Sequence, residues 1–139
     1  EEEFMKKRIF KNNNKYLLLL LWISGFLPDL KIFLNDLNKS FEFSWGRRPL
    51  TQNYNREVCD VEMSSDSLSF IFKNDFGIDT LNVNARFITN ANGRKRVIRA
   101  FFILSLNNTG RFLKISRFHE LVSIGFFKQG LKAIGLLKK

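Results

Sequence analysis

The sequence predicts an α+β fold: an N-terminal helix with a small, mainly antiparallel sheet, followed by a strand-turn-helix-strand unit at the C-terminal end. Three observations support this prediction. An apolar run at residues 16–27 has the length of a buried helix, polar and apolar residues alternate at 41–45, and helical spacing returns at 117–129. With 139 residues, of which 45% are hydrophobic, the chain is long enough to bury a core of its own.

The apolar run at 16–27 is the first predicted element. Its twelve residues fall short of the roughly 20 that a membrane-spanning helix needs, so we expect a core helix that ends near Gly25 and the turn at Pro28. Basic residues at 6–8 precede the run, as they do in a secretory signal, but no small-residue cleavage site follows. A short hydrophobic membrane anchor is the alternative interpretation.

Strands are expected after this helix. Residues 30–34 fit either a short strand or a helix extension, and the alternation at 41–45 predicts a strand with one apolar face. Further strands are predicted at 68–72, 81–87 and 97–106.

The C-terminal unit begins with a predicted hairpin. Residues 90–93 end in Asn-Gly, a pair that tolerates the positive φ of hairpin turns, and should join the strands 81–87 and 97–106. A helix at 117–129 with Gly130 as its C-cap and a final strand at 131–137 complete the prediction.

Charge is distributed unevenly along the chain. The net charge is +10, yet residues 57–85 carry a net −5 and residues 86–139 a net +11. We therefore divide the chain into an N-terminal α/β half with a variable acidic insertion (1–80) and a basic, RNA-binding half (81–139). The carboxylates of 57–79 should form a solvated loop or face a basic protein neighbour, away from RNA.

No catalytic constellation is visible in the sequence. The single histidine, His119, has no recognisable nucleophile partner, and the single cysteine, Cys59, is expected to be a small core or loop residue in a reducing compartment. The acidic spacing matches no metal-binding loop, and no glycine-rich phosphate loop is present. The sequence therefore predicts no enzyme activity, no catalytic residues, no metal site and no cofactor.

The basic residues of the second half are the candidate functional site. Arginine and lysine side chains at turns suit phosphate binding, because the guanidinium fork matches phosphate oxygens and the charge releases counterions. Phe87, Phe112 and Phe118 lie between them, either as core residues or as platforms for unpaired bases. The predicted RNA-binding residues are Arg94, Lys95, Arg96, Arg99, Arg111, Lys114, Arg117, Lys128, Lys132, Lys138 and Lys139.

Three segments resemble a known family. Residues 18–31 (LLLLWISGFLPDLK), residues 93–98 (GRKRVI) through 107–111 (NNTGR), and Glu120-Leu121 followed by 130–134 (GLKAI) are similar, in this order, to parts of the universal small-subunit ribosomal protein eight family. The resemblance implies a helix that turns at a glycine into a strand, a later strand that leads into 107–111, and rRNA binding. The family's Ser-Thr-Ser-Lys-Gly RNA-binding loop is absent, so the resemblance implies that RNA contacts move onto the basic residues above.

Composition indicates the compartment. The chain has sixteen phenylalanines but only four alanines and two prolines. Its abundant residues have A/T-rich codons, which is typical of a low-GC genome such as that of an organelle or a reduced bacterium. The expected function is a structural constituent of the mitochondrial small ribosomal subunit, organelle-encoded, with rRNA and neighbouring ribosomal proteins as partners and neither a small-molecule substrate nor a membrane. The alternative, from another class, is a peripheral or anchored accessory subunit of an organellar membrane complex.

Overall fold

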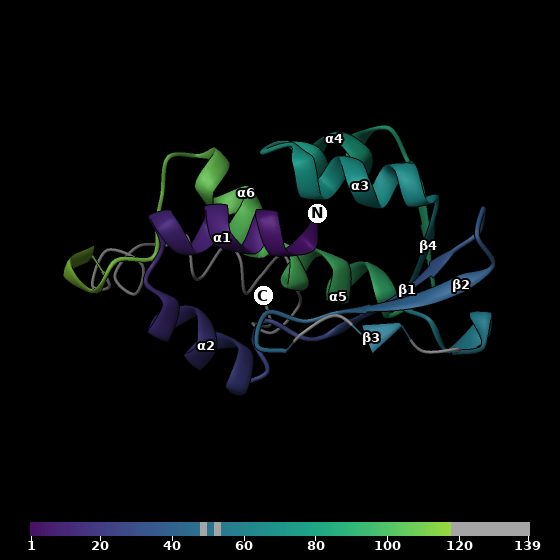
Figure 1. The fold of residues 1–139 in the computed structure, drawn as a ribbon, viewed down its shortest axis with the longest axis horizontal. Coiled ribbons are helices and arrows are strands. Elements are labelled where there is room, and N and C mark those ends of the chain that lie inside the picture. Colours follow the sequence, from purple (N-terminus) through teal and green to yellow (C-terminus); the bar gives the residue numbers. More distant parts are fainter. Residues whose placement is uncertain (48–49, 52–53, 118–139) are drawn as a thin grey trace, which may run out of the picture.

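The computed structural model describes residues 1–47, 50–51 and 54–117, which form six α-helices and one five-stranded sheet. The predicted α+β class is confirmed (Figure 1). In chain order the elements are α1 (Glu2–Asn12), α2 (Lys15–Ile23), β1 (Leu30–Leu34), β2 (Lys39–Phe43), β3 (Leu50–Thr51), a 3-10 turn (Arg56–Val58), β4 (Val61–Met63), α3 (Ser65–Lys73), α4 (Gly77–Val83), β5 (Phe87–Thr89), α5 (Gly93–Ala100), α6 (Phe102–Asn108) and a second 3-10 turn (Ile115–Arg117).

The sheet has the strand order β3-β2-β1-β4-β5 and is mainly antiparallel, as predicted. Only β1 and β4 run parallel, with Ile32 opposite Val61, while β1 and β2 pair antiparallel with Ile32 opposite Phe41. The expected acidic insertion thus supplies β4, which lies next to the central strand.

One face of the sheet carries the core. The strand predicted at 41–45 is confirmed as far as Phe43, where β2 ends, but its polar residues Glu42 and Ser44 are buried as well. The Phe43 ring is fully buried and lies 5.0 Å from the Phe101 ring and 5.3 Å from the Trp45 ring, centroid to centroid. The Trp45 indole donates a hydrogen bond to the Ala100 carbonyl (2.6 Å), which joins the end of β2 to α5. The core extends from Met5 in α1 to residues near the end of the described chain, and the expected boundary at 80–81 falls inside α4.

The strand predicted at 68–72 is wrong, because these residues belong to α3. The Ser64 hydroxyl caps the helix by accepting a hydrogen bond from the Ser67 amide (3.2 Å), and Leu68, Ile71 and Phe72 are buried at helical spacing. A five-residue apolar segment fits both periods, so only the cap distinguishes the helix from a strand.

The strand predicted at 97–106 is also wrong, because α5 and α6 occupy these residues. Val97, Phe101 and Leu104 are buried at helical spacing, but neighbouring residues are buried as well. The sequence of these helices is therefore a nearly continuous apolar run, in which the helical period of hydrophobic residues cannot be recognised. The strand expected at 81–87 is wrong over most of its length, because α4 ends at Val83, a turn follows, and β5 begins only at Phe87.

The hairpin expected at 90–93 is absent, since residues 91–92 form a turn that leads into α5 at Gly93. The Asn90 side-chain oxygen accepts hydrogen bonds from the Asn92 and Gly93 amides (3.1 and 2.6 Å), and its amide donates to the Cys59 carbonyl (3.0 Å). A Cβ on Gly93 would lie 1.8 Å from the Asp60 carbonyl oxygen, so glycine is required here by close packing. The helix expected at 117–129 and the strand at 131–137 lie outside the described residues, apart from Arg117.

The apolar run forms α2 and ends as predicted, with Gly25 at φ +74°. Leu18 is fully buried, whereas Tyr16, Leu20 and Ile23 are 79%, 59% and 74% exposed. The helix therefore packs on the core along one edge only. Within the described residues, no helix is both long and apolar enough to cross a membrane.

Candidate nucleic-acid interface

Four predicted RNA-binding residues, Arg94, Lys95, Arg96 and Arg99, lie on α5 rather than at a hairpin turn. The helix divides them into two pairs. Arg94 and Lys95 are exposed, whereas Arg96 and Arg99 are partly buried against the segment that joins α2 to β1. The four side chains therefore do not converge on one phosphate ridge.

Arg96 and Arg99 hold the chain itself. The Arg96 guanidinium pairs with the Asp60 carboxylate (2.9 Å) and donates to the Asp29 carbonyl (2.6 Å). Arg99 donates to the carbonyls of Phe26 (3.0 Å) and Gly25, and its guanidinium lies over the Phe26 ring. Both arginines thus anchor the turn between α2 and β1, a structural role that engages Nε and one terminal nitrogen of each guanidinium.

Three of the remaining predicted residues lie within the described part of the chain. Arg111 and Lys114 are exposed, in the segment that follows α6. Arg117 ends the second 3-10 turn. Lys128, Lys132, Lys138, Lys139 and His119 lie outside the described residues.

Arg111 and Lys114 lie beside the joint between α1 and α2. The Leu113 amide donates to the Asn13 side chain (2.8 Å), and the Leu113 carbonyl accepts from the Asn14 amide (2.6 Å). Asn14 also caps α2, because its side-chain oxygen accepts from the Leu17 amide (3.1 Å). Two segments a hundred residues apart are thereby fixed together.

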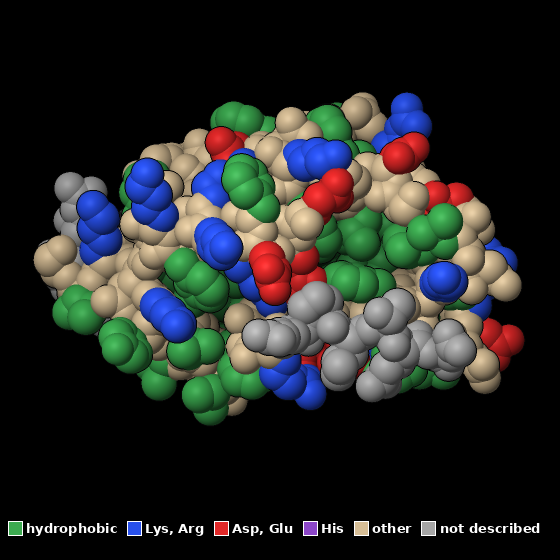
Figure 2. Space-filling model, viewed as in Figure 1, with side chains coloured by type: hydrophobic (Ala, Val, Ile, Leu, Met, Phe, Trp, Pro, Cys, Tyr) green, Lys and Arg blue, Asp and Glu red, His purple; other side chains and the backbone are tan. Residues whose placement is uncertain are grey.

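This joint brings together a set of cations, which we call the junction surface: Lys7, Lys11, Lys15, Arg111 and Lys114. All five are exposed, and Lys7 and Lys11 lie one turn apart on α1. No aspartate or glutamate occurs in residues 4–28 or 102–117, the two segments that build the surface. In Figure 2, Lys and Arg side chains gather over the end of the molecule where α1 meets α2, without acidic side chains among them.

The carboxylates of 57–79 are used largely within the chain. Asp60 pairs with Arg96, and Glu62 pairs with Arg56 (2.7 Å). Asp75 pairs with Arg8 (3.1 Å), whereas Asp79 accepts hydrogen bonds from the Ser105 hydroxyl (2.8 Å) and the Asn108 side chain (2.6 Å). The acidic middle therefore neutralises basic residues of this chain, a use that no local sequence pattern shows. Cys59, which precedes Asp60 in the chain, is buried, in agreement with the expected small core or loop residue.

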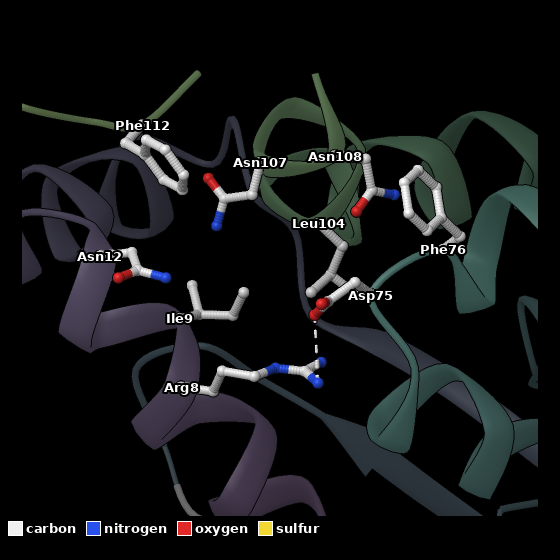
Figure 3. Close-up of a pocket in the computed structure, with 9 residues that line it drawn as sticks. All are labelled: Arg8, Ile9, Asn12, Asp75, Phe76, Leu104, Asn107, Asn108 and Phe112. Atoms are coloured by element: carbon white, nitrogen blue, oxygen red, sulfur yellow. Dashed lines mark ion pairs between the residues drawn. The ribbon is translucent and has the colours of Figure 1, made fainter. Parts of the chain in front are cut away.

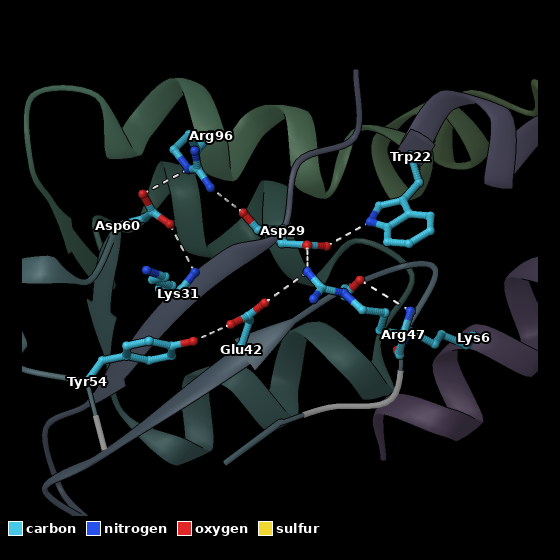
Figure 4. A network of polar contacts seen from close by, with 10 residues as sticks. Lys6, Trp22, Asp29, Lys31, Glu42, Arg47, Tyr54, Asp60 and Arg96 are labelled. Atoms are coloured by element: carbon cyan, nitrogen blue, oxygen red, sulfur yellow. Dashed lines mark hydrogen bonds and ion pairs between the residues drawn. The ribbon is translucent and has the colours of Figure 1, made fainter. Parts of the chain in front are cut away.

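A second polar cluster, on the sheet side of α2, is centred on Asp29 (Figure 4). Its carboxylate accepts a hydrogen bond from the Trp22 indole (2.8 Å) and pairs with the Arg47 guanidinium, which also pairs with Glu42 (3.3 Å). The Tyr54 hydroxyl donates to the other oxygen of Glu42 (2.6 Å). Every group in this cluster has a partner, so it ties strands and helices together and leaves no reactive group free within the part described.

Burial alone would raise the pKa of Asp29, but hydrogen bonds from Ser44, Trp22 and Arg47 outweigh it and lower this pKa below its ordinary value. Folding is therefore favoured by ionised Asp29. Its contribution is complete above pH ~4, the ordinary aspartate range, and disappears as the pH falls through the lowered pKa.

Replacing Asp29 with asparagine should lower the free energy of unfolding at pH 7 by about 1–2 kcal/mol, since the variant cannot make the hydrogen bonds that a partly buried charge accepts. The variant should also lose less stability than the wild type between pH 5 and pH 2 (roughly the range of carboxylate titration). Urea unfolding across this range measures both effects. Glu57→Gln, at an exposed carboxylate, is the control and should behave as the wild type; equal acid sensitivity of Asp29→Asn and wild type would contradict the assignment.

Sequence reasoning missed Lys7, Lys11 and Lys15. The net charge of the first 56 residues is only +4, because Glu1, Glu2 and Glu3 offset the lysines that follow them. Those glutamates lie at the opposite end of α1. The sequence feature that could have identified these lysines is the 25-residue interval at 4–28, which contains no carboxylate.

Comparison of the chain with protein-family models, with curated proteins and with solved structures finds no match.

Proposed function

We propose that this chain is a structural RNA-binding protein of the mitochondrial small ribosomal subunit and that the junction surface binds the rRNA backbone. The observation that carries the proposal is the junction surface itself: five exposed cations from two distant segments, with no carboxylate in either segment. Such a surface attracts polyanions and releases their counterions on binding. The mechanism is static, since the joint between α1, α2 and Leu113 is fixed by hydrogen bonds before RNA arrives.

The ribosomal part of the proposal has two supports. Helix α2, the glycine turn at Gly25 and strand β1 follow one another in the order that the resemblance to the ribosomal protein eight family implies. The A/T-codon bias of the composition favours an organellar origin. Residues 93–108 differ from the family's expected strand, because they form α5 and α6.

Among the contacts predicted from sequence, Arg94, Lys95, Arg111 and Lys114 remain candidates because they are exposed. Arg96 and Arg99 are better assigned to anchoring the turn before β1. Protein neighbours are proposed for the surfaces that carry exposed carboxylates, such as Glu57 and Asp66, because these repel RNA.

Replacing Lys7 and Lys11 together with alanine should weaken RNA binding and leave folding intact, because exposed substitutions usually cost about 0.5 kcal/mol or less. The slope of log affinity against log salt should flatten by about 1.4–1.8, at roughly 0.7 to 0.9 for each phosphate that the variant no longer neutralises. Filter binding to mitochondrial rRNA fragments over a salt series measures this slope.

The matched control removes the same charge elsewhere. Lys39 and Arg86 are exposed and lie outside the two segments of the junction surface, so replacing both with alanine should change the slope much less. Equal effects of the two double variants would mean that binding follows net charge alone, and the junction surface would lose its assignment.

One observation favours the alternative function, an accessory subunit at the surface of an organellar membrane complex. Tyr16, Leu20 and Ile23 form an exposed apolar stripe along α2, next to the lysines of the junction surface. Apolar and basic side chains together can bind an anionic membrane surface. Flotation with cardiolipin-containing vesicles, abolished in a Leu20→Ser variant that still binds RNA normally, would favour this alternative over the ribosomal proposal.

A further inference from the structure

A pocket with a largely polar and aromatic lining lies beside the junction surface. It has a volume of about 290 Å³ and lies between α1, α6 and the loop that joins α3 to α4 (Figure 3). Its lining residues are mostly amides and aromatic rings rather than aliphatic side chains. They include Arg8, Asn12, Phe76, Asn107, Asn108 and Phe112.

Two polar side chains of this pocket carry buried atoms that lack a hydrogen-bond partner among the described residues. Both the oxygen and the nitrogen of the Asn107 amide are buried with no hydrogen-bond partner among the described residues. Arg8 pairs with Asp75 through one nitrogen (3.1 Å), while its Nε and its other terminal nitrogen are buried and without a partner in the same part of the chain. By contrast, Asn108 donates to Asp79 (2.6 Å) and is satisfied. Buried polar atoms are nearly always paired with protein, water or ligand, so these atoms can accept a hydrogen-bonding partner from outside the chain.

The unpaired atoms define the chemistry of that partner. A carboxamide offers one donor and one acceptor side by side, the arrangement that pairs with the edge of a nucleobase such as adenine. Figure 3 shows the Asn107 amide aimed into the space between Phe112 and α1, with Phe76 on the other side of α6. An aromatic ring beside such an amide supplies a face on which a base can stack. A cavity near 300 Å³ is at the small end of ligand pockets and suits one planar base rather than a helix.

The pocket also adjoins the proposed phosphate contacts. Asn12 directly follows Lys11, and Phe112 lies between Arg111 and Leu113, which is bound to the α1–α2 joint. A strand whose phosphates lie on the junction surface can therefore place one unpaired base in the pocket.

We propose that this pocket binds a single unpaired nucleobase of the RNA that the junction surface holds, with Asn107 pairing to the base edge and Phe112 stacking on its face. This inference rests on the proposed function. It adds a preference for RNA loops or bulges over continuous duplex, which phosphate contacts alone do not provide.

The test uses Asn107→Leu in the full chain. Replacing an unsatisfied buried amide with an apolar side chain of similar size should leave the melting temperature equal or higher, so misfolding does not confound the result. Affinity for a stem-loop with unpaired adenines should fall about tenfold, while affinity for the same stem as a closed duplex and the salt slope should not change. Phe112→Leu should give a similar reduction for the stem-loop, and Asn82→Ala, at an exposed amide of α4, should match the wild type.

The outcomes separate this inference from the proposed function. Wild-type binding to both RNAs with no effect of Asn107→Leu overturns the base pocket alone, and binding to neither RNA overturns the proposed function as well. Free adenosine monophosphate provides the third arm. Saturable binding of the free nucleotide, without any preference for the stem-loop over the duplex, would show a nucleotide site independent of RNA and would also overturn the inference.

Discussion

Replacing Leu18 with aspartate should unfold the protein. Leu18 is the fully buried residue of α2 and part of the core that joins α1, α2 and the sheet. Leucine-to-alanine changes at such sites already cost about 2–5 kcal/mol, and an unpaired buried carboxylate adds several more. Since small domains are stable by only about 5–15 kcal/mol, circular dichroism and urea unfolding should show a chain that is largely unfolded at 25 °C.

Leu20 provides the matched control on the same helix. Its side chain is 59% exposed, so Leu20→Asp should change the free energy of unfolding by less than ~1 kcal/mol. From the sequence alone, each leucine of the run was an equal candidate for the core. If Leu20→Asp unfolded the chain as Leu18→Asp does, α2 would have to be covered on both sides.

Replacing Gly93 with alanine should also destabilise the fold strongly. The new Cβ would lie 1.8 Å from the Asp60 carbonyl oxygen, which belongs to backbone leading into β4 and cannot turn aside as a side chain would. Either α5 or that backbone must move, and overpacking of this kind costs about 1–3 kcal/mol or more. Thermal and urea unfolding of the variant measure the destabilisation.

Gly110→Ala is the control for Gly93→Ala, because alanine at Gly110 introduces backbone strain without a steric clash. Gly110 has φ +73° with open space around its Cα, so alanine there should cost only about 1 kcal/mol of conformational strain. A Gly93→Ala variant that is no less stable than Gly110→Ala would show that the packing between the start of α5 and Asp60 is not tight.

The accuracy of prediction depended on whether polar and apolar residues alternate clearly along the segment. Strand β2 was predicted correctly because Phe41 and Phe43 are separated by polar Glu42, which gives a clear period of two. Helices α5 and α6 were missed because the apolar residues 100–104 form an unbroken run, in which burial on several sides removes the polar positions that reveal a period.

Tertiary contacts decided the rest. Asn92-Gly93 has the composition of a hairpin turn, but here the glycine is needed for close packing against Asp60, which lies far away in the sequence and which no local pattern shows. The candidate site shows the same limit. Charge along the sequence identified the exposed Arg111 and Lys114 but not their neighbours on α1, because the hydrogen bonds between Asn13, Asn14 and Leu113 bring these segments together.

The bonds between Asn13, Asn14 and Leu113 also set an order of events during synthesis. Helix α1 leaves the ribosome early, but its joint with α2 cannot close until residue 113 has been made, a hundred positions later. Contacts at such separation in sequence form slowly and late in folding. A nascent chain would therefore expose its lysines on an open helix pair, and the complete cationic surface would exist only on a chain translated at least to Leu113. Products truncated before Leu113 would lack it, so the proposed RNA binding would require a chain translated at least that far.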